Sequence, residues 1–278
     1  MSSCPEPDGF QDQVLETVME ALDETGFLDQ AVLQDGSCIL GCYGGQRISR
    51  DLDFAVGDGV DANTIKDASR LLPEKLRAEF GSETVVRPPT ENDNPFVSRW
   101  SIAVRQPGTT PDMPKFRTKV EMARVPTITC DSSYWTPNPD ANSHIIVYCE
   151  GREEILADKI ISLTMTESHV RWRDVWDISF LERTARITDK DLILGMCLEK
   201  LPVYGYQESK WSEGMDRTIE LLDSSGAAQE LKIALNRQIL GASPTLSDRI
   251  AIATIHNTRN VLESVLALEH ERNHPEER

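Results

Sequence analysis

Two carboxylates separated by one residue are the part of this sequence best suited to chemistry. Asp51 and Asp53 lie in residues 51–56, where polar and apolar side chains alternate as they do in a half-buried strand. Side chains at positions i and i+2 of a strand point to the same face, so we expect both carboxylates on one side of a sheet. Such a pair can bind one or two Mg²⁺ ions, which are hard cations that prefer oxygen ligands.

A Gly-Ser pair precedes these acids, with Ser37 fourteen residues before Asp51. At a turn from a strand into a helix, Gly36 and Ser37 would offer backbone N–H groups and a hydroxyl to a phosphate at the helix N-terminus. Glycine is useful in this position because it allows the backbone to approach a ligand closely. The two motifs together predict a device that holds a metal-bound triphosphate.

Further groups extend this motif. Arg47 and Ser49 precede the acids at alternate positions and would add a positive charge and a hydroxyl to the same approach. A third carboxylate is expected on a neighbouring strand, and Glu121 is the best candidate because it lies between alternating apolar residues. Two metal ions about 3.5–4 Å apart can activate an attacking hydroxyl and neutralise a leaving pyrophosphate. The general base would be Glu121 or a metal-bound hydroxide, and the sequence leaves both open.

The elements that must position these residues fall into two halves. In the first half, helices are predicted at 11–25 and 62–80 and strands at 31–34, 51–56, 83–87, 99–105 and 116–124. In the second half, helical patterns dominate, at 152–167, 171–184, 189–200, 212–235 and 247–270. The Pro-, Asn- and Ser-rich segment 126–148 is predicted to connect them. We therefore expect an α/β domain with an N-terminal helix over residues 1–148 and a helical domain over residues 149–278.

The charge of the chain limits its partners. The net charge is −17, from 29 Lys and Arg against 46 Asp and Glu, so the protein is not expected to wrap nucleic acid by bulk electrostatics. Residues 99–124 are the exception, with six basic and two acidic side chains. This local excess fits a small anionic ligand or one end of an RNA, or else it is a solvated strand face.

Apolar runs and cysteines indicate the compartment. No apolar run reaches the roughly 18–20 residues that a membrane span needs, and the acidic N-terminus lacks the basic start of a signal peptide. The six cysteines form no CxxC pair and are interpreted as free, mostly buried thiols. We therefore expect a cytoplasmic protein with no membrane partner, and a structural zinc ion is not expected.

Several short blocks occur in an order that is shared with a known family. These blocks are Gly36-Ser37, the Arg-x-Ser-x-Asp-Leu-Asp-Phe run at 47–54, Val120-Glu121, Lys159 and the Arg-Asp-Val-Trp-Asp-Ile run at 173–178. Over roughly residues 32–180 the sequence resembles the AbiEii-type nucleotidyltransferase toxins, a family that includes the MenT toxins. One departure is Asp35, because many relatives have Gly-Gly-Thr or Gly-Gly-Ser where this chain has Asp-Gly-Ser.

The resemblance implies a fold and an activity. The fold would be α+β, with a polymerase-β-like nucleotidyltransferase domain that contains a mixed sheet, followed by a helical domain. Members act as toxins in type IV toxin–antitoxin and phage-defence systems, and their usual partner is a cognate antitoxin. The reaction is transfer of a nucleoside monophosphate from an NTP with Mg²⁺ or Mn²⁺. For some members the acceptor is the 3′ end of tRNA, which blocks aminoacylation and stops translation.

The resemblance also implies roles for single residues in the first half of the chain. Ser37 would contact a terminal phosphate of the NTP, with Gly36 beside it. Asp51 and Asp53 would bind the metal ions. Glu121 would take the place of the family's third acidic residue.

In the second half, Lys159 fits the family's helix-borne lysine, which is expected to neutralise the triphosphate. Asp174 and Asp177 both fit an acidic position near the site, and the sequence does not choose between them. The alternative for Lys159 is a surface lysine in an i,i+4 pair with a glutamate.

Two other functions compete with transfer to RNA. The same core is able to transfer a nucleotide to a protein side chain or to a small molecule. A catalytically inactive relative would instead act by binding a partner. Retention of Asp51, Asp53 and Glu121 argues against inactivity, because a dead site has no physical need to keep like charges crowded together.

Overall fold

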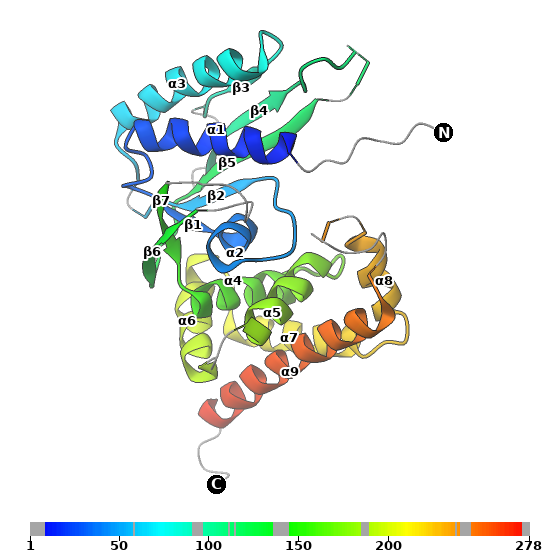
Figure 1. Cartoon of the computed structure of the whole chain (residues 1–278). Coiled ribbons are helices and arrows are strands. Elements are labelled where there is room, and N and C mark those ends of the chain that lie inside the picture. The colour runs from blue at the N-terminus through cyan, green and yellow to red at the C-terminus, as the bar shows by residue number, and fades with distance from the viewer. Residues whose placement is uncertain are drawn as a thin grey trace. The chain divides into compact units, whose positions relative to one another are not determined.

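The chain divides into two compact units in a computed structural model (Figure 1). One unit comprises Met1–Gly44 with Ser49–Glu150, and the other comprises Gly45–Ile48 with Gly151–Arg278. The structure describes residues 9–57, 59–90, 97–110, 112–113, 115–135, 145–184, 189–236, 238–239 and 246–273. Within these ranges no helix is both long enough and apolar enough to cross a membrane.

The first unit is built on a mixed seven-stranded sheet with the order β3-β4-β5-β2-β1-β7-β6. Its strands are β1 (Val32–Gln34), β2 (Leu52–Ala55), β3 (Val85–Arg87), β4 (Val97–Val104), β5 (Phe116–Ala123), β6 (Cys130–Tyr134) and β7 (Ile146–Glu150). Strand β2 pairs in parallel with β5, and β1 pairs in parallel with β7, while the other neighbours are antiparallel. The predicted α+β fold class is confirmed.

One face of this sheet is apolar and is covered by α1 (Phe10–Glu24) and α3 (Ala62–Phe80), which pack side by side. Alternate side chains of β4 and β5 are buried, as a strand with one covered face requires. Trp100 of β4 is fully buried, and its indole N–H donates to the Ser69 hydroxyl of α3 at 3.0 Å. Phe27 contacts Phe54 and Trp100 edge to face. The other face therefore carries the polar side chains of the same strands.

A third helix, α2 (Asp35–Tyr43), follows β1 directly and packs near β1, β2, β6 and β7. It lies on the covered face, because Cys149, which approaches α2, is in register with Leu33, and Leu33 is in register with the buried Phe54. Gly41 of α2 packs so closely on Trp135 that an added Cβ would overlap the indole ring. This contact fixes the helix against the β6 end of the sheet.

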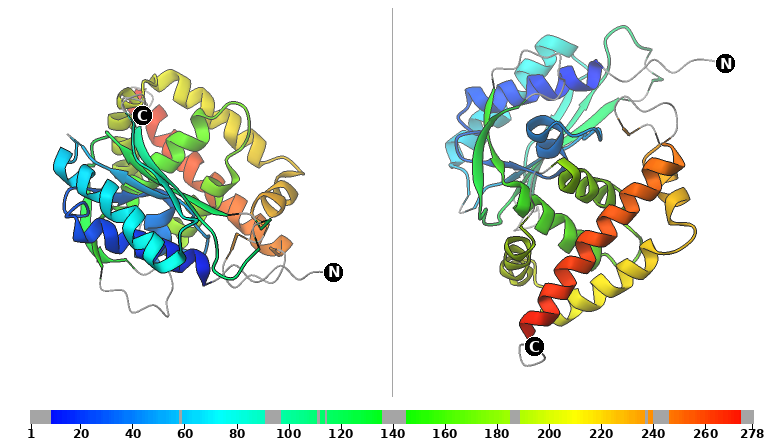
Figure 2. Two further views of the ribbon diagram at one scale, coloured as in Figure 1. Left: turned by 90° about the horizontal axis from the view of Figure 1, so that it is seen from above. Right: turned by 60° about the horizontal axis from the view of Figure 1, so that its bottom comes forward.

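The second unit is helical. Its helices are α4 (Arg152–Met165), α5 (Trp172–Thr184), α6 (Lys190–Val203), α7 (Glu208–Leu222), α8 (Ala227–Ala234) and α9 (Asp248–Asn273). The long last helix, α9, is the orange-to-red helix of Figure 2 and packs against α5, α6, α7 and α8. Lys200 is buried and pairs with Glu154 at 2.6 Å and with Asp158 at 2.7 Å, which joins α6 to α4.

Two predictions about the elements are wrong. Segment 126–148, which was expected to be a connection, contains β6 and the start of β7. Strand β6 is polar and lies at the sheet edge, so it lacks the apolar alternation of a buried strand. The single helix expected over 212–235 is two helices, because residues 223–226, Asp-Ser-Ser-Gly, form a turn between α7 and α8. Helix α3 contains Pro73 and continues past it, so the helix predicted over 62–80 is unbroken.

Candidate active site

The strand register places Asp53 beside Glu121. Parallel strands β2 and β5 pair these two residues directly, and on either side Asp53 is in register with Gln34 of β1 and Glu121 with Arg99 of β4. Side chains at paired positions of neighbouring strands point to the same face. Gln34, Asp53, Glu121 and Arg99 therefore form one row across the polar face of the sheet.

Asp51 lies just before β2 and is held against β5. The backbone N–H of Lys119 donates to Asp51 Oδ1 at 3.1 Å, and the Thr118 hydroxyl donates to the Arg50 carbonyl at 2.5 Å. The side chain of Asp51 is 40% exposed and that of Glu121 is 27% exposed, so both carboxylates are open to solvent. This arrangement leaves their oxygens accessible to a cation.

Two basic side chains stand over the same carboxylates. Lys119 Nζ lies 3.4 Å from Glu121 Oε1 and 4.0 Å from Asp51 Oδ2, and Arg99 lies 3.4 Å from the same Glu121 oxygen. Exposed contacts of this length are weak, and they are easily exchanged for contacts with a bound anion. Because Arg99 and Lys119 belong to the predicted basic stretch, that stretch places positive charge beside the acids.

Two other cations of the basic stretch, Arg105 and Lys115, are engaged elsewhere in the same unit. Arg105 forms an ion pair with Glu83 and donates to the carbonyls of Thr110 and Met113. Lys115 donates to the Glu83 carbonyl at 2.5 Å. These two cations hold β3, β4 and the loop before β5 together, so they are structural.

The three carboxylates share a face without forming a closed ligand group. In the described ranges, the only three acidic, histidine or cysteine side chains whose ligand atoms all lie within 4.8 Å of one another are Cys38, Cys42 and Cys149. Like charges repel at short range, which favours some separation of the carboxylates of Asp51, Asp53 and Glu121. Joint coordination of one ion would require these side chains to move closer together.

The Gly-Ser pair lies in the first turn of α2. This helix begins at Asp35, directly after Gln34, which is the register partner of Asp53. Ser37 is buried, and its hydroxyl donates to the Gln34 carbonyl at 3.3 Å. The N-terminus of α2 therefore starts at the row of acidic residues, and its N–H groups and partial positive charge are suited to an anion.

Asp35 has a left-handed backbone, with a φ of 58°. Glycine adopts this conformation without strain, and aspartate is among the few other residues that tolerate it. The geometry gives a physical reason why a glycine suits this position. In this chain the substitution also puts a carboxylate beside the candidate phosphate loop.

A second cluster of predicted residues lies in the helical unit. Lys159 of α4 is 4% exposed, and its Nζ lies 3.0 Å from Asp174 Oδ1 and 2.9 Å from Asp177 Oδ2, both on α5. Arg47 donates to both oxygens of Asp177, at 2.8 and 2.6 Å, and Arg171 pairs with Asp174. Two buried carboxylates are thus shared among three cations.

The motif Arg47-x-Ser49-x-Asp51 is divided between the two units. The segment Gly45–Ile48 belongs to the helical unit, where the Ile48 N–H donates to the Gln238 carbonyl at 2.8 Å. Ser49 belongs to the sheet unit, and its hydroxyl donates to the Asp51 carbonyl at 3.3 Å.

The surface-lysine alternative for Lys159 is wrong, because this side chain is buried.

The sequence alone did not predict some features of these sites. The involvement of Arg99 and Lys119 with Glu121 follows from the strand register, and alternation along β4 and β5 was the available signal. The approach of Cys149 to Cys38 and Cys42 had no local signal, because it depends on the packing of α2 against β7.

Comparison with known proteins identifies the family. A family model described as nucleotidyl transferase AbiEii toxin, type IV TA system, matches residues 17–240. The chain belongs to this family. The match includes the residues of both clusters described above, and it confirms the resemblance and the expected nucleotidyltransferase activity. Comparison with curated protein sequences gives no significant match.

One solved structure of a nucleotidyltransferase toxin shares the fold of this chain. The MenT4 nucleotidyltransferase toxin from Mycobacterium tuberculosis is 15% identical, with a TM-score of 0.54, and the alignment covers 92% of this chain and 82% of that one. JHP933 from Helicobacter pylori is 18% identical, with a TM-score of 0.48, over 94% of this chain and 97% of the other.

Proposed function

We propose that this AbiEii-family nucleotidyltransferase transfers a nucleoside monophosphate from an NTP to RNA, with the 3′ end of tRNA as the acceptor. Such a transfer would block aminoacylation and stop translation, which is the effect expected of a toxin. The observation that carries this proposal is the row in which Asp53 lies beside Glu121, next to the N-terminus of α2.

The carboxylates of Asp51, Asp53 and Glu121, called the carboxylate row from here on, fit a hard divalent cation. Asp51, Asp53 and Glu121 offer only oxygen ligands on one solvent-accessible face, which suits Mg²⁺ or Mn²⁺. A bound ion of this kind would neutralise the triphosphate and lower the pKa of the attacking hydroxyl. The charge balance of the face supports this role, because the carboxylates already attract Lys119 and Arg99 in place of an ion.

The NTP would bind with its phosphates at the start of α2. Backbone N–H groups around Gly36 and Ser37 would donate to phosphate oxygens, as at other helix N-termini. The Ser37 hydroxyl would give up its bond to the Gln34 carbonyl and donate to a terminal phosphate. Lys119 and Arg99 would contact the negative charge that develops during transfer.

Glu121 would accept the proton of the acceptor hydroxyl. Its carboxylate is partly exposed on the same face as Asp53, so a hydroxyl bound above the row would be within its reach. Proton transfer from a 3′-hydroxyl to Glu121 would leave an oxygen nucleophile. Its attack on the α-phosphate would form the new P–O bond, break the bond to the β-phosphate and release pyrophosphate. Binding of this hydroxyl would require Lys119 to move from Glu121.

The resemblance assigns Lys159 to nucleotide binding and one of its two aspartate partners to the site. The support in the structure is the strong organisation of this cluster, in which buried cations and carboxylates hold α4, α5 and Arg47 in a fixed geometry. A phosphate would have to compete with two aspartates for Lys159. Because Asp177 contacts both cations, we propose that it positions Lys159 and Arg47.

The acceptor would be an RNA end held on the open sheet face. Arg117 is in register with Ala103 and therefore points to the same face as Lys119 and Arg99. These side chains give a small basic area in a protein of net charge −17, which suits a contact with one RNA end and disfavours unspecific wrapping. A cognate antitoxin in the cytoplasm would restrain such an activity.

The proposal is tested by incubating the protein and Mg²⁺ with each of the four α-labelled NTPs, with purified tRNA or with total protein as acceptor. We expect label on tRNA from at least one NTP, and its loss in a double variant, Asp51→Ala with Asp53→Ala. Glu74→Gln is a matched control, because Glu74 is an exposed acid of α3 that is 66% accessible. Label found only in protein would refute the RNA acceptor.

A further inference from the structure

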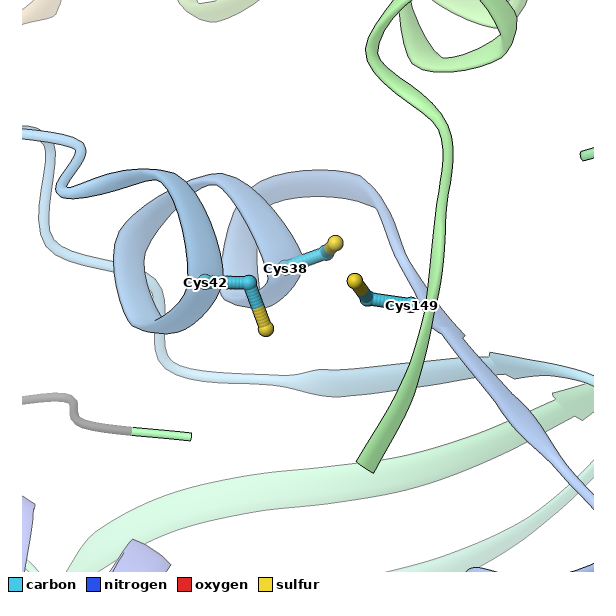
Figure 3. A group of neighbouring side chains, drawn as sticks. All are labelled: Cys38, Cys42 and Cys149. Carbon is cyan, nitrogen blue, oxygen red and sulfur yellow. The ribbon is translucent and has the colours of Figure 1, made fainter. Parts of the chain in front are cut away.

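Three cysteines from two elements meet on the covered face of the sheet. Cys38 and Cys42 lie one turn apart on α2, and Cys149 lies on β7, with all three Sγ atoms within 4.8 Å of one another (Figure 3). Cys38 is fully buried, Cys149 is 2% exposed and Cys42 is half-buried. All three are free thiols. This group is separate from the carboxylate row, which lies on the opposite face.

We propose that Cys38, Cys42 and Cys149 form a binding site for one thiophilic d¹⁰ metal ion, Zn²⁺ or Cu⁺. Thiolate sulfurs are the ligands that both ions prefer. A Zn–S bond of about 2.3 Å in tetrahedral geometry places the sulfurs about 3.8 Å apart. Small rotations of the three side chains would therefore bring the sulfurs to bonding distance. The half-buried position of Cys42 leaves one side of the cluster accessible to a water molecule as a fourth ligand.

The convergence of three sulfurs favours a metal over a disulfide. A disulfide needs two sulfurs and an oxidant, and it would leave the third thiol without a role. A soft cation uses all three and requires only the loss of their protons. The surroundings are also well fixed, because the Tyr43 hydroxyl donates to the Glu150 carbonyl at 2.7 Å and so ties the last turn of α2 to the end of β7.

Hydrogen bonding and burial act differently on the three thiols. Hydrogen bonds from Cys38 and Cys42 lower the pKa of the Cys149 thiol. The bond to Cys149 raises the pKa of Cys42 to about 12, and burial raises the pKa of Cys38. A metal ion would displace the protons of Cys38 and Cys42, so its affinity would increase with pH.

The position of the cluster on α2 connects it with the nucleotide loop. Cys38 directly follows Ser37, and both belong to the first half of the helix. A metal bond from Cys38 to Cys149 would fix this half of α2 on β7. The metal site itself does not depend on the proposed transferase reaction, so the two can be tested separately.

The experiment is an anaerobic titration of the reduced full-length protein with Co²⁺, followed in the ultraviolet. We expect one Co²⁺ per chain with a sulfur-to-metal charge-transfer band, displacement of that band by Zn²⁺, and proton release on binding. A second arm uses Cu⁺ in competition with a chromophoric chelator and shows which ion binds more tightly. Co²⁺ also binds oxygen ligands, so the Asp53→Asn variant serves as a control for binding at the carboxylates. It should show the same sulfur-to-metal band as the wild type.

Variants locate the site. Cys149→Ser and Cys42→Ala should weaken Co²⁺ binding at least about tenfold, whereas Cys130→Ala, an exposed cysteine outside the cluster, should not. Circular dichroism checks that each variant is folded. Because Cys42 is only half-buried, Cys42→Ala still tests the site if Cys149→Ser does not fold. Absence of the sulfur band in the wild type would overturn the proposal. So would an unchanged band in both cluster variants, or a loss of two thiols to a disulfide without metal binding.

Discussion

Replacement of Asp177 by asparagine should destabilise the helical unit strongly. The Asp177 carboxylate is 1% exposed and accepts two hydrogen bonds from Arg47, at 2.8 and 2.6 Å, and an ion pair from Lys159 at 2.9 Å. The neutral amide would remove one of the two negative charges that balance these buried cations. Breaking a buried ion pair from one side costs about 3–5 kcal/mol. This corresponds to a decrease in Tm of roughly 6–20 °C.

The matched variant is Lys159→Met, which removes one cation and leaves each carboxylate a partner, Arg171 for Asp174 and Arg47 for Asp177. We therefore expect a clearly smaller decrease in Tm for Lys159→Met than for Asp177→Asn. Thermal unfolding followed by circular dichroism measures both, and nucleotide titration of the folded proteins tests the proposed phosphate contact of Lys159. Wild-type stability of Asp177→Asn would refute the reasoning about this cluster.

Three other substitutions test the sheet unit. Asp53→Asn should reduce nucleotidyl transfer at least about a hundredfold. Its Tm should be unchanged or up to about 3 °C higher, because a like charge beside Glu121 is removed. A large decrease in Tm would contradict this role. Asp35→Gly should strengthen NTP binding about fivefold by removing a negative charge beside the phosphate loop, as measured by calorimetry, and weaker binding would count against the loop. Gly41→Ala should destabilise the fold by about 1–3 kcal/mol because its Cβ overlaps Trp135, and denaturant unfolding at wild-type stability would disprove that contact.

Much of the carboxylate row was predictable from the sequence. Alternation along residues 51–56 and 116–124 predicts two strands, and it places Asp53 and Glu121 at positions opposite to the apolar residues of each strand. Their direct pairing was not predictable, because β5 is separated from β2 by two other strands in the chain and joins it in parallel. Only tertiary structure sets that register.

Long-range pairs explain the remaining differences. Arg47 was expected beside Asp51 because the two are close in sequence, but its guanidinium pairs with Asp177, 130 residues away. The cysteines were interpreted only as free, mostly buried thiols, because the approach of Cys149 to Cys38 and Cys42 depends on the packing of α2 against β7. Strand β6 was missed because a polar edge strand looks like a loop when only hydrophobic alternation is considered.

The central claim, that Asp51, Asp53 and Glu121 hold a divalent ion for an NTP, is tested most directly by electron paramagnetic resonance of bound Mn²⁺. The protein is titrated with Mn²⁺ in the presence of a non-hydrolysable NTP analogue, beside Asp53→Asn and the exposed-acid control Glu74→Gln. We predict Mn²⁺ that binds to wild type and to Glu74→Gln and is lost in Asp53→Asn. Equal Mn²⁺ binding by all three proteins would contradict the account.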